Sequence, residues 1–170
     1  MRLALEVTTA QAVTHAFHVA PQIVMEELET AMGSALQYLK RETIELTPKA
    51  FGLLRRAYDT HVYPSPLLTS IFGELTNSLP YALPVELGTA PHFPPLEPLI
   101  TWVEVKLGIE GDEAEGVARA IQRKIGRFGT PGYGMARHAL IDGQTTIEQE
   151  FRDALERIVL RVAAVGGTAS

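Results

Sequence analysis

Apolar residues recur along the chain with two different periods, and the period changes from one segment to the next. Near the N-terminus every second residue is apolar, namely Leu3, Leu5 and Val7. This alternation is typical of a half-buried strand. Thr8 or Thr9 is then expected to cap a short helix that ends near Phe17.

A long amphipathic helix is predicted between Pro21 and Leu46. Proline is favoured at the first helical position, and Thr47-Pro48 ends the pattern. The apolar residues of this helix are three or four positions apart: Val24, Leu28, Met32, Ala35 and Leu39. The charged residues fall elsewhere on it: Glu26, Glu27, Glu29 and Lys40.

Three more helices are expected in the second half of the chain. The first carries Leu96, Leu99, Ile100, Val103 and Leu107 at helical spacing. The second covers about Asp112 to Phe128, with a stripe formed by Ala114, Val117, Ala118, Ile121, Ile125 and Phe128. The third begins near Thr145 or Thr146, with Glu148 as part of a capping box. Its buried face is expected to contain Ile147, Phe151, Ala154, Leu155, Ile158, Val159 and Val162.

Strand-like and turn-like segments fill the spaces between these helices. Leu53–Tyr63 and Leu67–Thr76 are predicted to form a hairpin around the turn Pro64-Ser65-Pro66. Tyr81–Leu87 indicates a helical turn that Gly88 can stop. Further along, we expect Gly129–Gly134 to be a flexible loop and Met135–Leu140 a short segment before Asp142-Gly143.

The expected fold class is therefore α+β. A small, mostly antiparallel sheet with a long hairpin is packed against several helices, which cover one face. We expect a single domain over residues 1–165 and a disordered tail over residues 166–170.

Composition limits the function more than it identifies it. The 170 residues carry a net charge of −5, and a dedicated nucleic-acid-binding protein usually has a basic excess. The sequence contains no cysteine, which excludes disulfides and thiolate metal sites. No apolar run is long enough to span a bilayer, and the N-terminus is not a signal peptide. We expect the protein to fold in a reducing cytoplasm.

Candidate chemistry is sparse. His15 and His18 are spaced to share a metal, but no third ligand is nearby, so we expect neither metal nor cofactor. Glu86 and His92 would be the base and acid of a small hydrolase, although no nucleophile elbow accompanies them. The favoured alternative is that both residues hydrogen-bond to loop backbone. The glycines between 129 and 134 fit neither a dinucleotide-binding nor a phosphate-binding loop.

Local basic groups and aromatic residues are the candidate contact residues. One basic group is Lys49, Arg55 and Arg56, and the other is Arg119, Arg123, Lys124 and Arg127. Such runs are usually solvated helix faces, but they also fit an acidic neighbour or passing DNA phosphates. The aromatic candidates, Phe93, Trp102 and Tyr133, suit either a subunit interface or a core.

Three segments resemble the tail-completion family of long-tailed bacteriophages, also called tail-terminator or neck proteins. Residues 81–108 carry tyrosine-alanine, valine-glutamate and glycine-threonine pairs, then the elbow Pro91-His92-Phe93-Pro94-Pro95 and a helix with Trp102. Residues 47–58 resemble the family's approach to its hairpin, and residues 125–140 its glycine-threonine-proline loop. The three segments follow the family's order. Relatives commonly have aspartate-threonine where this chain has Ala50-Phe51.

The resemblance implies a structural protein of the virion and not an enzyme. Members form a ring, typically a hexamer, at the head-proximal end of the tail. The ring terminates the tail tube and joins it to the head connector, and double-stranded DNA passes through without sequence-specific binding. The alternatives are a head-closure stopper or a minor tail component, and more remotely the hydrolase. No membrane is involved.

Contacts with neighbouring subunits are expected at two places. One is the proline elbow 91–95, and the other is the basic residues, namely Arg55 and Arg56 of the first group and Arg123, Lys124 and Arg127 of the second. The hairpin is also expected to pair its edge strands with another subunit or with a tube subunit.

Overall fold

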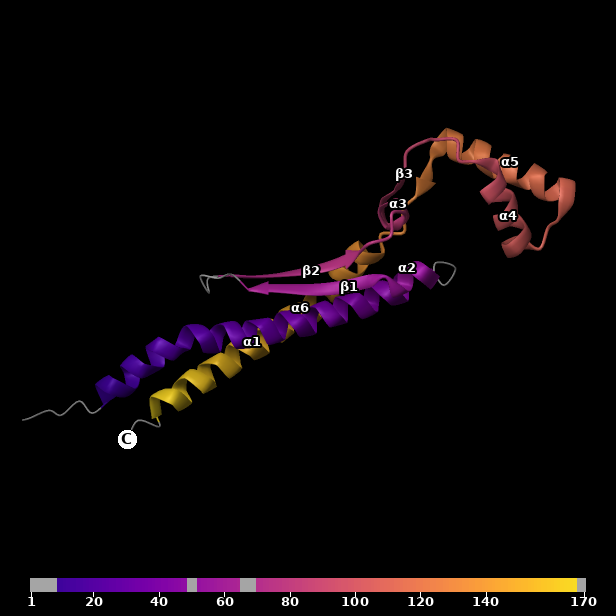
Figure 1. The fold of residues 1–170 in the computed structure, drawn as a ribbon. Helices are drawn as coiled ribbons and strands as arrows, with labels where there is room; N and C mark the ends of the chain where they lie inside the picture. The colour runs from indigo at the N-terminus through magenta and orange to yellow at the C-terminus, as the bar shows by residue number, and fades with distance from the viewer. Residues whose placement is uncertain (1–8, 49–51, 65–69, 168–170) are drawn as a thin grey trace, which may run out of the picture. The chain divides into compact units, whose positions relative to one another are not determined.

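The computed structural model describes residues 9–48, 52–64 and 70–167, which fall into two compact units (Figure 1). The larger unit combines the chain up to Ser78 with the chain from Met135, and the smaller unit is Leu79–Gly134. The described residues form helices and two small antiparallel sheets, so the predicted α+β fold class is confirmed. A single domain over residues 1–165 stays a prediction, because contacts alone do not show whether two units unfold together.

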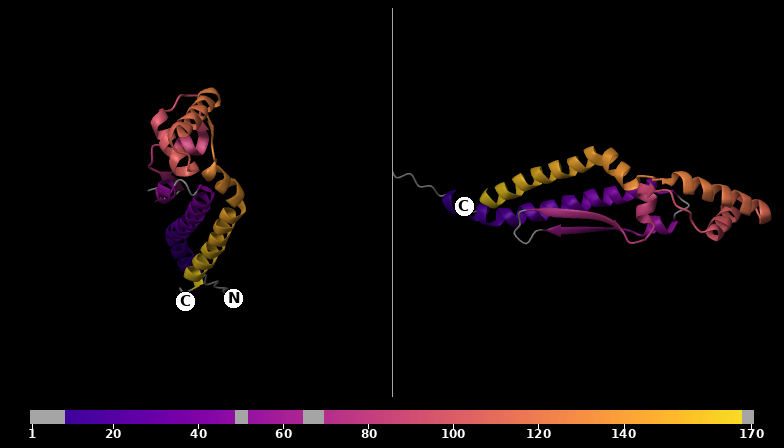
Figure 2. Two further views of the ribbon diagram at one scale, coloured as in Figure 1. Left: turned by 90° about the vertical axis from the view of Figure 1, so that its right-hand side faces the viewer. Right: turned by 90° about the horizontal axis from the view of Figure 1, so that it is seen from above.

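Two long helices, α1 (Thr9–Leu46) and α6 (Met135–Gly167), form the frame of the larger unit. They lie side by side and run in opposite directions (Figure 1, Figure 2). Small side chains are buried on both helices: Ala31 and Ala35 on α1, and Ala139 and Ala154 on α6. Small residues allow two helix backbones to approach closely, because the interaxial distance depends on the side chains at the contact.

The predicted break before Pro21 is wrong, because α1 continues through this proline as one helix. A proline inside a helix removes one backbone hydrogen bond and costs about 3 kcal/mol or more. Ile23 and Met25, directly after it, are only 7% and 4% exposed. Burial of Ile23 and Met25 offsets the cost of the proline. The pattern of residues along one helix does not reveal this compensation.

The predicted interruption around Asp142-Gly143 is also wrong, because α6 is continuous from Met135. Gly143 is buried, and a side chain there would collide with the ring of Tyr38 on α1. The close approach of the two helices therefore requires glycine at this point. Tertiary packing outweighs the weak helix propensity of glycine, which is about 1 kcal/mol poorer than that of alanine.

The predicted hairpin is present, but its first strand begins later than expected. Gly52–Arg56 forms a short helix, α2, in place of a strand. Strands β1 (Tyr58–Pro64) and β2 (Ile71–Asn77) then pair with Tyr58 opposite Asn77 and Pro64 opposite Ile71. Most of the predicted turn lies outside the described residues, which include only Pro64 of it.

One face of the hairpin lies on α1, and the other is open to solvent. On the inner face, a side chain at Gly73 would collide with Met32 and meet Leu36, so the strand passes very close to the helix. Gln37 of α1 donates a hydrogen bond to the Thr60 hydroxyl at 3.0 Å. On the outer face, Tyr63 and Phe72 lie opposite each other and are 48% and 63% exposed. An isolated two-stranded hairpin is only marginally stable, so its contact with α1 holds it in place.

The smaller unit contains the helices predicted for it. They are α3 (Ala82–Leu87), which Gly88 ends as expected, α4 (Leu96–Leu107) and α5 (Gly111–Phe128). Helices α4 and α5 pack on a small core of three buried residues, Val103, Ala114 and Ala118. The half-buried residues around this core are Leu96, Leu99, Ile100, Ile109, Val117 and Ile121.

Two residues of the predicted buried face of α6, Leu155 and Val159, are 57% and 67% exposed, so the prediction is wrong for them. Two members of the predicted apolar stripes are exposed as well: Leu107 of α4 (50%) and Phe128 of α5 (71%). Helical periodicity does not define how wide the covering surface is. The predicted N-terminal strand lies outside the described residues. So does the predicted tail, except Gly166 and Gly167, which belong to α6.

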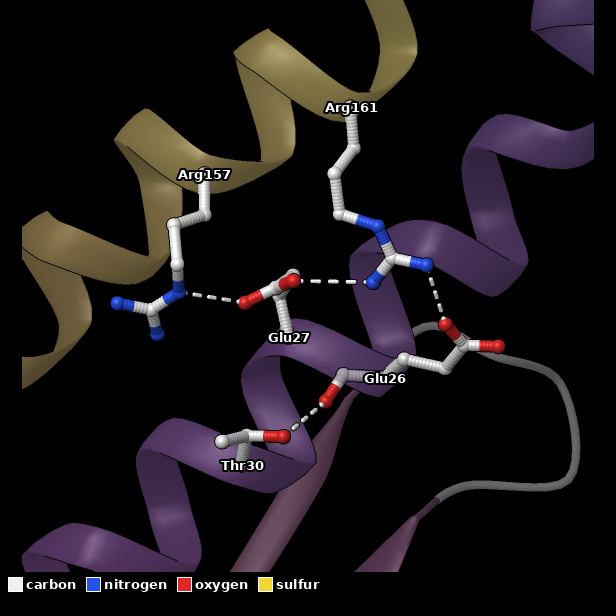
Figure 3. A network of polar contacts seen from close by, with 5 residues as sticks. All are labelled: Glu26, Glu27, Thr30, Arg157 and Arg161. Atoms are coloured by element: carbon white, nitrogen blue, oxygen red, sulfur yellow. Dashed lines mark hydrogen bonds and ion pairs between the residues drawn. The ribbon is translucent and has the colours of Figure 1, made fainter. Parts of the chain in front are cut away.

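A charged network joins α1 to α6 (Figure 3). The Glu27 carboxylate accepts a hydrogen bond from Arg157 Nε at 2.7 Å and another from Arg161 at 2.9 Å. Arg161 also donates to Glu26 at 2.7 Å. The Glu27 side chain is only 11% exposed, and the bonds from Arg157 and Arg161 hold its pKa below its ordinary value of 4.5. The sequence pattern gave no reason to place Glu27 in this contact.

Replacement of Glu27 tests this network. Glu27→Gln is expected to lower the thermal midpoint near neutral pH by roughly a few °C, because it leaves two arginines without their carboxylate. A carboxyl whose pKa is lowered by folding stabilises the fold above its ordinary pKa, and this stabilisation is lost as the pH falls. The difference from the unsubstituted protein should therefore shrink below pH 4.5 in thermal melts followed by circular dichroism.

Glu29→Gln is the matched control, because Glu29 is an exposed glutamate on the same helix. It should leave the midpoint unchanged. Equal losses for both variants, or a Glu27→Gln deficit that persists unchanged in acid, would contradict the proposed role of the network.

Candidate functional site

The glycine-threonine pairs of two sequence segments meet in the smaller unit. Strand β3 (Gly88–Thr89) pairs antiparallel with β4 (Thr130–Pro131), and Thr89 lies opposite Thr130. Their hydroxyl oxygens are 2.9 Å apart, and the Thr130 amide donates to the Thr89 hydroxyl at 3.2 Å. We refer to β3 and β4 together as the threonine clasp. The prediction of a flexible loop over Gly129–Gly134 is wrong for Thr130–Pro131, which form β4; the pairing joins positions too far apart in the sequence for a local pattern to reveal it.

Backbone hydrogen bonds extend the threonine clasp on one side. The amides of Tyr133 and Gly134 donate to the carbonyls of Val85 and Glu86, each at 2.9 Å. The segments joined in this way are the first and last parts of the smaller unit. The clasp therefore closes the unit at the place where the chain enters and leaves it.

Glycine is required at two positions next to the clasp. Gly88 and Gly129 have φ angles of 80° and 68°, in the region that residues with a side chain rarely adopt. A Cβ at Gly88 would collide with the Thr130 carbonyl, and a Cβ at Gly129 would collide with the Thr89 carbonyl. Both the backbone angle and the lack of space exclude other residues from these positions.

The two residues of the hydrolase alternative both take part in loop backbone bonding. His92 Nδ1 lies 3.0 Å from the Ala90 carbonyl oxygen, and the His92 amide donates to Ile125 at 3.4 Å. Glu86 accepts the Gly134 bond through its main-chain oxygen. The His92 contact agrees with the interpretation in which this side chain holds the elbow, and for the Glu86 side chain the interpretation stays a prediction. An acid–base role for the pair remains an untested alternative.

The proline elbow is attached to α5. Gln122 Nε2 donates to the Pro94 carbonyl at 2.8 Å. The Phe93 ring lies against Gly126, where a side chain would collide with it. Even so, Phe93 is 71% exposed, and Pro91 and Pro95 are exposed beside it. The elbow thus presents an apolar surface on a rigid support.

The two neighbouring arginines of the first basic group have different surroundings. Arg55 is 22% exposed and donates to the Thr47 carbonyl at 2.7 Å, with Glu45 at 3.7 Å. It therefore connects α2 to the end of α1. Arg56 is exposed and bonds only weakly along its own helix, to the Gly52 carbonyl at 3.3 Å. Of the two, Arg56 is the one available for contact with another molecule.

Arg56 lines an open polar groove of about 500 Å³ beside the hairpin. The groove is lined by Lys40, Arg56, Ala57, Tyr58, Asp59, His61, Thr76 and Ser78. Within it, Asp59 lies 3.8 Å from Lys40 and 3.7 Å from His61. The hydrogen bond from the Thr60 amide, together with the nearby His61 and Lys40 side chains, lowers the pKa of the Asp59 carboxyl. Sequence reasoning missed this groove, because Lys40 and Asp59 are far apart along the chain.

The second basic group lies along the last turns of α5. Arg119 pairs with Glu115 one turn earlier, and the Arg127 guanidinium lies 5.8 Å from the Phe128 ring centroid. Arg123 and Lys124 are exposed and have no ion-pair partner among the described residues. Cations near a helix C-terminus interact favourably with the helix dipole, which explains part of this grouping without a partner.

Two of the aromatic candidates are also at the surface. Trp102 is 47% exposed, and Tyr133 is 52% exposed. Pro98 and Val105 lie one turn from Trp102 and are exposed too, whereas Val103 faces α5. Helix α4 therefore has a second apolar stripe on a side that the described residues leave open.

The structure offers no support for a metal site or a membrane span in its described part. Among the described residues, no three histidine, aspartate or glutamate side chains gather closely enough to hold a metal ion. The side chain of His15 is not among those described. None of the described helices has the length and hydropathy that a bilayer crossing needs.

Replacement of Gly129 tests the threonine clasp. Gly129→Ala is expected to destabilise the protein by about 1–3 kcal/mol, because the strained backbone angle and the Thr89 carbonyl both oppose a side chain. Gly116→Ala is the matched control, since a Cβ at this helical position meets nothing within 4 Å. It should stabilise by about 0.5–1 kcal/mol. Denaturant unfolding measures both effects, and a neutral Gly129→Ala would disprove the requirement for glycine.

Comparison with known proteins adds no relative to these observations. No family model, curated protein or solved structure matches the chain. The likeness to tail-completion proteins therefore depends on the residues quoted above and on their arrangement.

Proposed function

We propose that this chain is a structural, non-enzymatic protein of a phage tail or tail-like particle. In this proposal, copies of it form a ring, most simply a hexamer, at the head-proximal end of the tail. The ring terminates the tail tube, joins it to the head connector and lets double-stranded DNA pass through its lumen. The protein is made in the host cytoplasm and then becomes part of the virion.

One observation carries the proposal. Two of the three family-like segments, which are far apart in the sequence, pair directly through Thr89 and Thr130 in the threonine clasp. The pairing makes residues of both motifs part of one small structural element, which supports reading the motifs together. The motifs therefore behave as parts of one structural unit, as expected if they descend together from such a family.

The exposed apolar side chains agree with a role in assembly. Phe72, Phe93 and Phe128 are 63%, 71% and 71% exposed, on the hairpin, the elbow and α5. Contiguous apolar surface on a monomer marks contact sites, and at the elbow Phe93 has Pro91 and Pro95 exposed beside it. Contacts between different surfaces of identical subunits close into rings when the rotation between them allows it.

The net charge agrees with a conduit for DNA. A basic lumen would release counterions on contact and hold the duplex tightly. A chain with net charge −5 has little tendency to do so. The basic residues of α5 are then better suited to an acidic protein neighbour than to passing phosphates.

Imaging of assembled particles tests the proposed function. The purified protein, alone and mixed with tail tubes from the same genome, should appear as rings or as caps on tube ends. Cross-linking to tube protein and to connector protein together supports the joining role, while connector alone indicates a stopper. A protein that never joins a tube or a connector, in any mixture, would overturn the proposal. Connector genes upstream and a tube gene downstream of its own gene are the expected genomic context.

Charge reversal distinguishes the roles of the two adjacent arginines. Arg56→Glu should reduce capping of tube ends and change stability by no more than about 0.5 kcal/mol, because Arg56 is exposed. Arg55→Glu should destabilise the fold, because it removes the bond to the Thr47 carbonyl.

Arg41→Glu is the matched control for charge, since it makes the same charge change at an exposed residue of the same unit. Arg41 pairs with Glu42 and lies 5.2 Å from the Tyr38 ring centroid, so its reversal should lower stability slightly but leave capping unchanged. Capping is counted in electron micrographs, and unfolding is followed by circular dichroism. If the Arg56→Glu variant caps tube ends normally, the polar groove that Arg56 lines is not a contact with the tube.

A further inference from the structure

The two edges of the β1–β2 hairpin differ in their capacity to accept another strand. Among the described residues the sheet has only these two strands, each of seven residues, so each strand has one edge without a neighbour. Unpaired edges are templates for pairing with another chain unless they are protected. The question is which of the two edges is protected here.

The register and two hydrogen bonds show which backbone groups point outward. The Thr60 amide donates to the Asp59 carboxylate at 2.8 Å, so it does not point toward β2. The Asp59 carbonyl instead lies within 3.5 Å of the Thr76 hydroxyl on the opposite strand. Outward and inward groups alternate along an antiparallel strand. The backbone amide and carbonyl groups of Thr60 and Val62 therefore point to the open side of β1. Those of their partners Leu75 and Gly73 point to the open side of β2.

The β1 edge is largely blocked. Its Thr60 amide is already bonded to Asp59, and Pro64 at the end of the strand has no amide hydrogen. Asp59 is in turn fixed by Lys40 of α1. Of Thr60, Val62 and Pro64, Val62 alone keeps an amide that can donate and a carbonyl that can accept along this edge.

The β2 edge has no such protection. Residues 71–77 contain neither proline nor lysine, the residues that usually protect an edge. By the same alternation the backbone groups of Ile71, Gly73 and Leu75 point to the open side of β2. The strand passes close to α1 at Gly73, where a side chain would collide with Met32. The β2 edge thus presents a row of donors and acceptors without the protection found on β1.

We propose that the β2 edge binds an extended segment of a partner protein, which adds a third strand to the hairpin. The segment carries small or β-branched apolar residues beside Gly73 and Leu75 on the inner face. On the outer face it carries a lysine or arginine opposite Glu74, which is exposed. Opposite charges facing each other across two strands are stabilising, and like charges are destabilising.

A second copy of this chain is a poorer occupant of the same edge. Full-length antiparallel pairing of β2 with another β2 places Glu74 opposite Glu74. Pairing of β2 with a neighbour's β1 meets the blocked edge described above. The proposal goes beyond the head–tail role and does not require it, since it concerns the hairpin of the isolated chain.

Peptide binding followed by amide NMR of the full chain tests the proposal. The probe is the acetylated and amidated peptide Thr-Thr-Val-Lys-Val-Thr-Thr, whose lysine is opposite Glu74 when the strands align. At millimolar peptide the amides of Ile71, Gly73 and Leu75 should shift, and that of Val62 should not. A peptide with glutamate for lysine should bind roughly threefold or more weakly. A peptide N-methylated at both valines should not bind, because it lacks the required donors.

Proline variants supply a matched pair on the protein side. Leu75→Pro removes an outward amide, so it should abolish peptide binding and leave the hairpin amides dispersed. Glu74→Pro removes an amide of the β1–β2 ladder, so it should disrupt the hairpin itself.

Three outcomes would overturn the proposal. The first is peptide shifts at Val62 equal to those at Gly73. The second is unchanged binding by Leu75→Pro, and the third is no shift with any peptide. A doubled mass in solution, with shifts at Gly73 that depend on protein concentration alone, would show that the occupant is a second copy.

Discussion

The close approach of α1 and α6 is the contact on which the larger unit depends. The chain leaves this unit at Ser78 and returns at Met135, so α6 is held to α1 by packing and by the charged network. Buried alanines and Gly143 allow the approach, and the bonds of Glu27 to Arg157 and Arg161 fix the position of one helix along the other. The hairpin rests on α1, and its position is therefore set by the same frame.

The threonine clasp joins the first and last parts of the smaller unit, as the charged network joins α1 to α6 in the larger unit. A unit inserted into another needs its first and last residues close together, so that the chain can leave and return. The pairing of Gly88–Thr89 with Thr130–Pro131 meets this need with few residues, because Gly88 and Gly129 carry no Cβ that would collide with the facing carbonyls. Glycine also adopts the positive φ angles of these two positions without strain.

Local sequence patterns predicted the elements that depend on local causes. Helices α4 and α5, the stop at Gly88 and the second strand of the hairpin follow from periodicity and capping chemistry. The errors occurred where distant residues decide the outcome. Pro21 and Gly143 interrupt a helical pattern, yet packing keeps both helices continuous.

The candidate site shows the same difference between features that have local causes and features that join distant residues. The elbow residues were found from their order in the sequence, whereas the contacts of Glu27 and the pairing of Lys40 with Asp59 join distant positions. A charged residue on an apolar stripe has the same local appearance whether it faces solvent or a partner helix. Only the fold distinguishes Arg55, which is bonded inward, from its exposed neighbour Arg56.

Large apolar side chains of the smaller unit are much more exposed than the small ones. The fully buried core of the smaller unit consists of one valine and two alanines, whereas Trp102, Val105 and Phe128 are 47%, 72% and 71% exposed. Burial of apolar area contributes roughly 25 cal/mol per Å², so the exposed parts of these large side chains add nothing to the stability of the unit. Small units with small cores are marginally stable alone. A partner that covers Trp102 and its neighbours would supply the missing burial, and assembly and stability of this unit would then rise together.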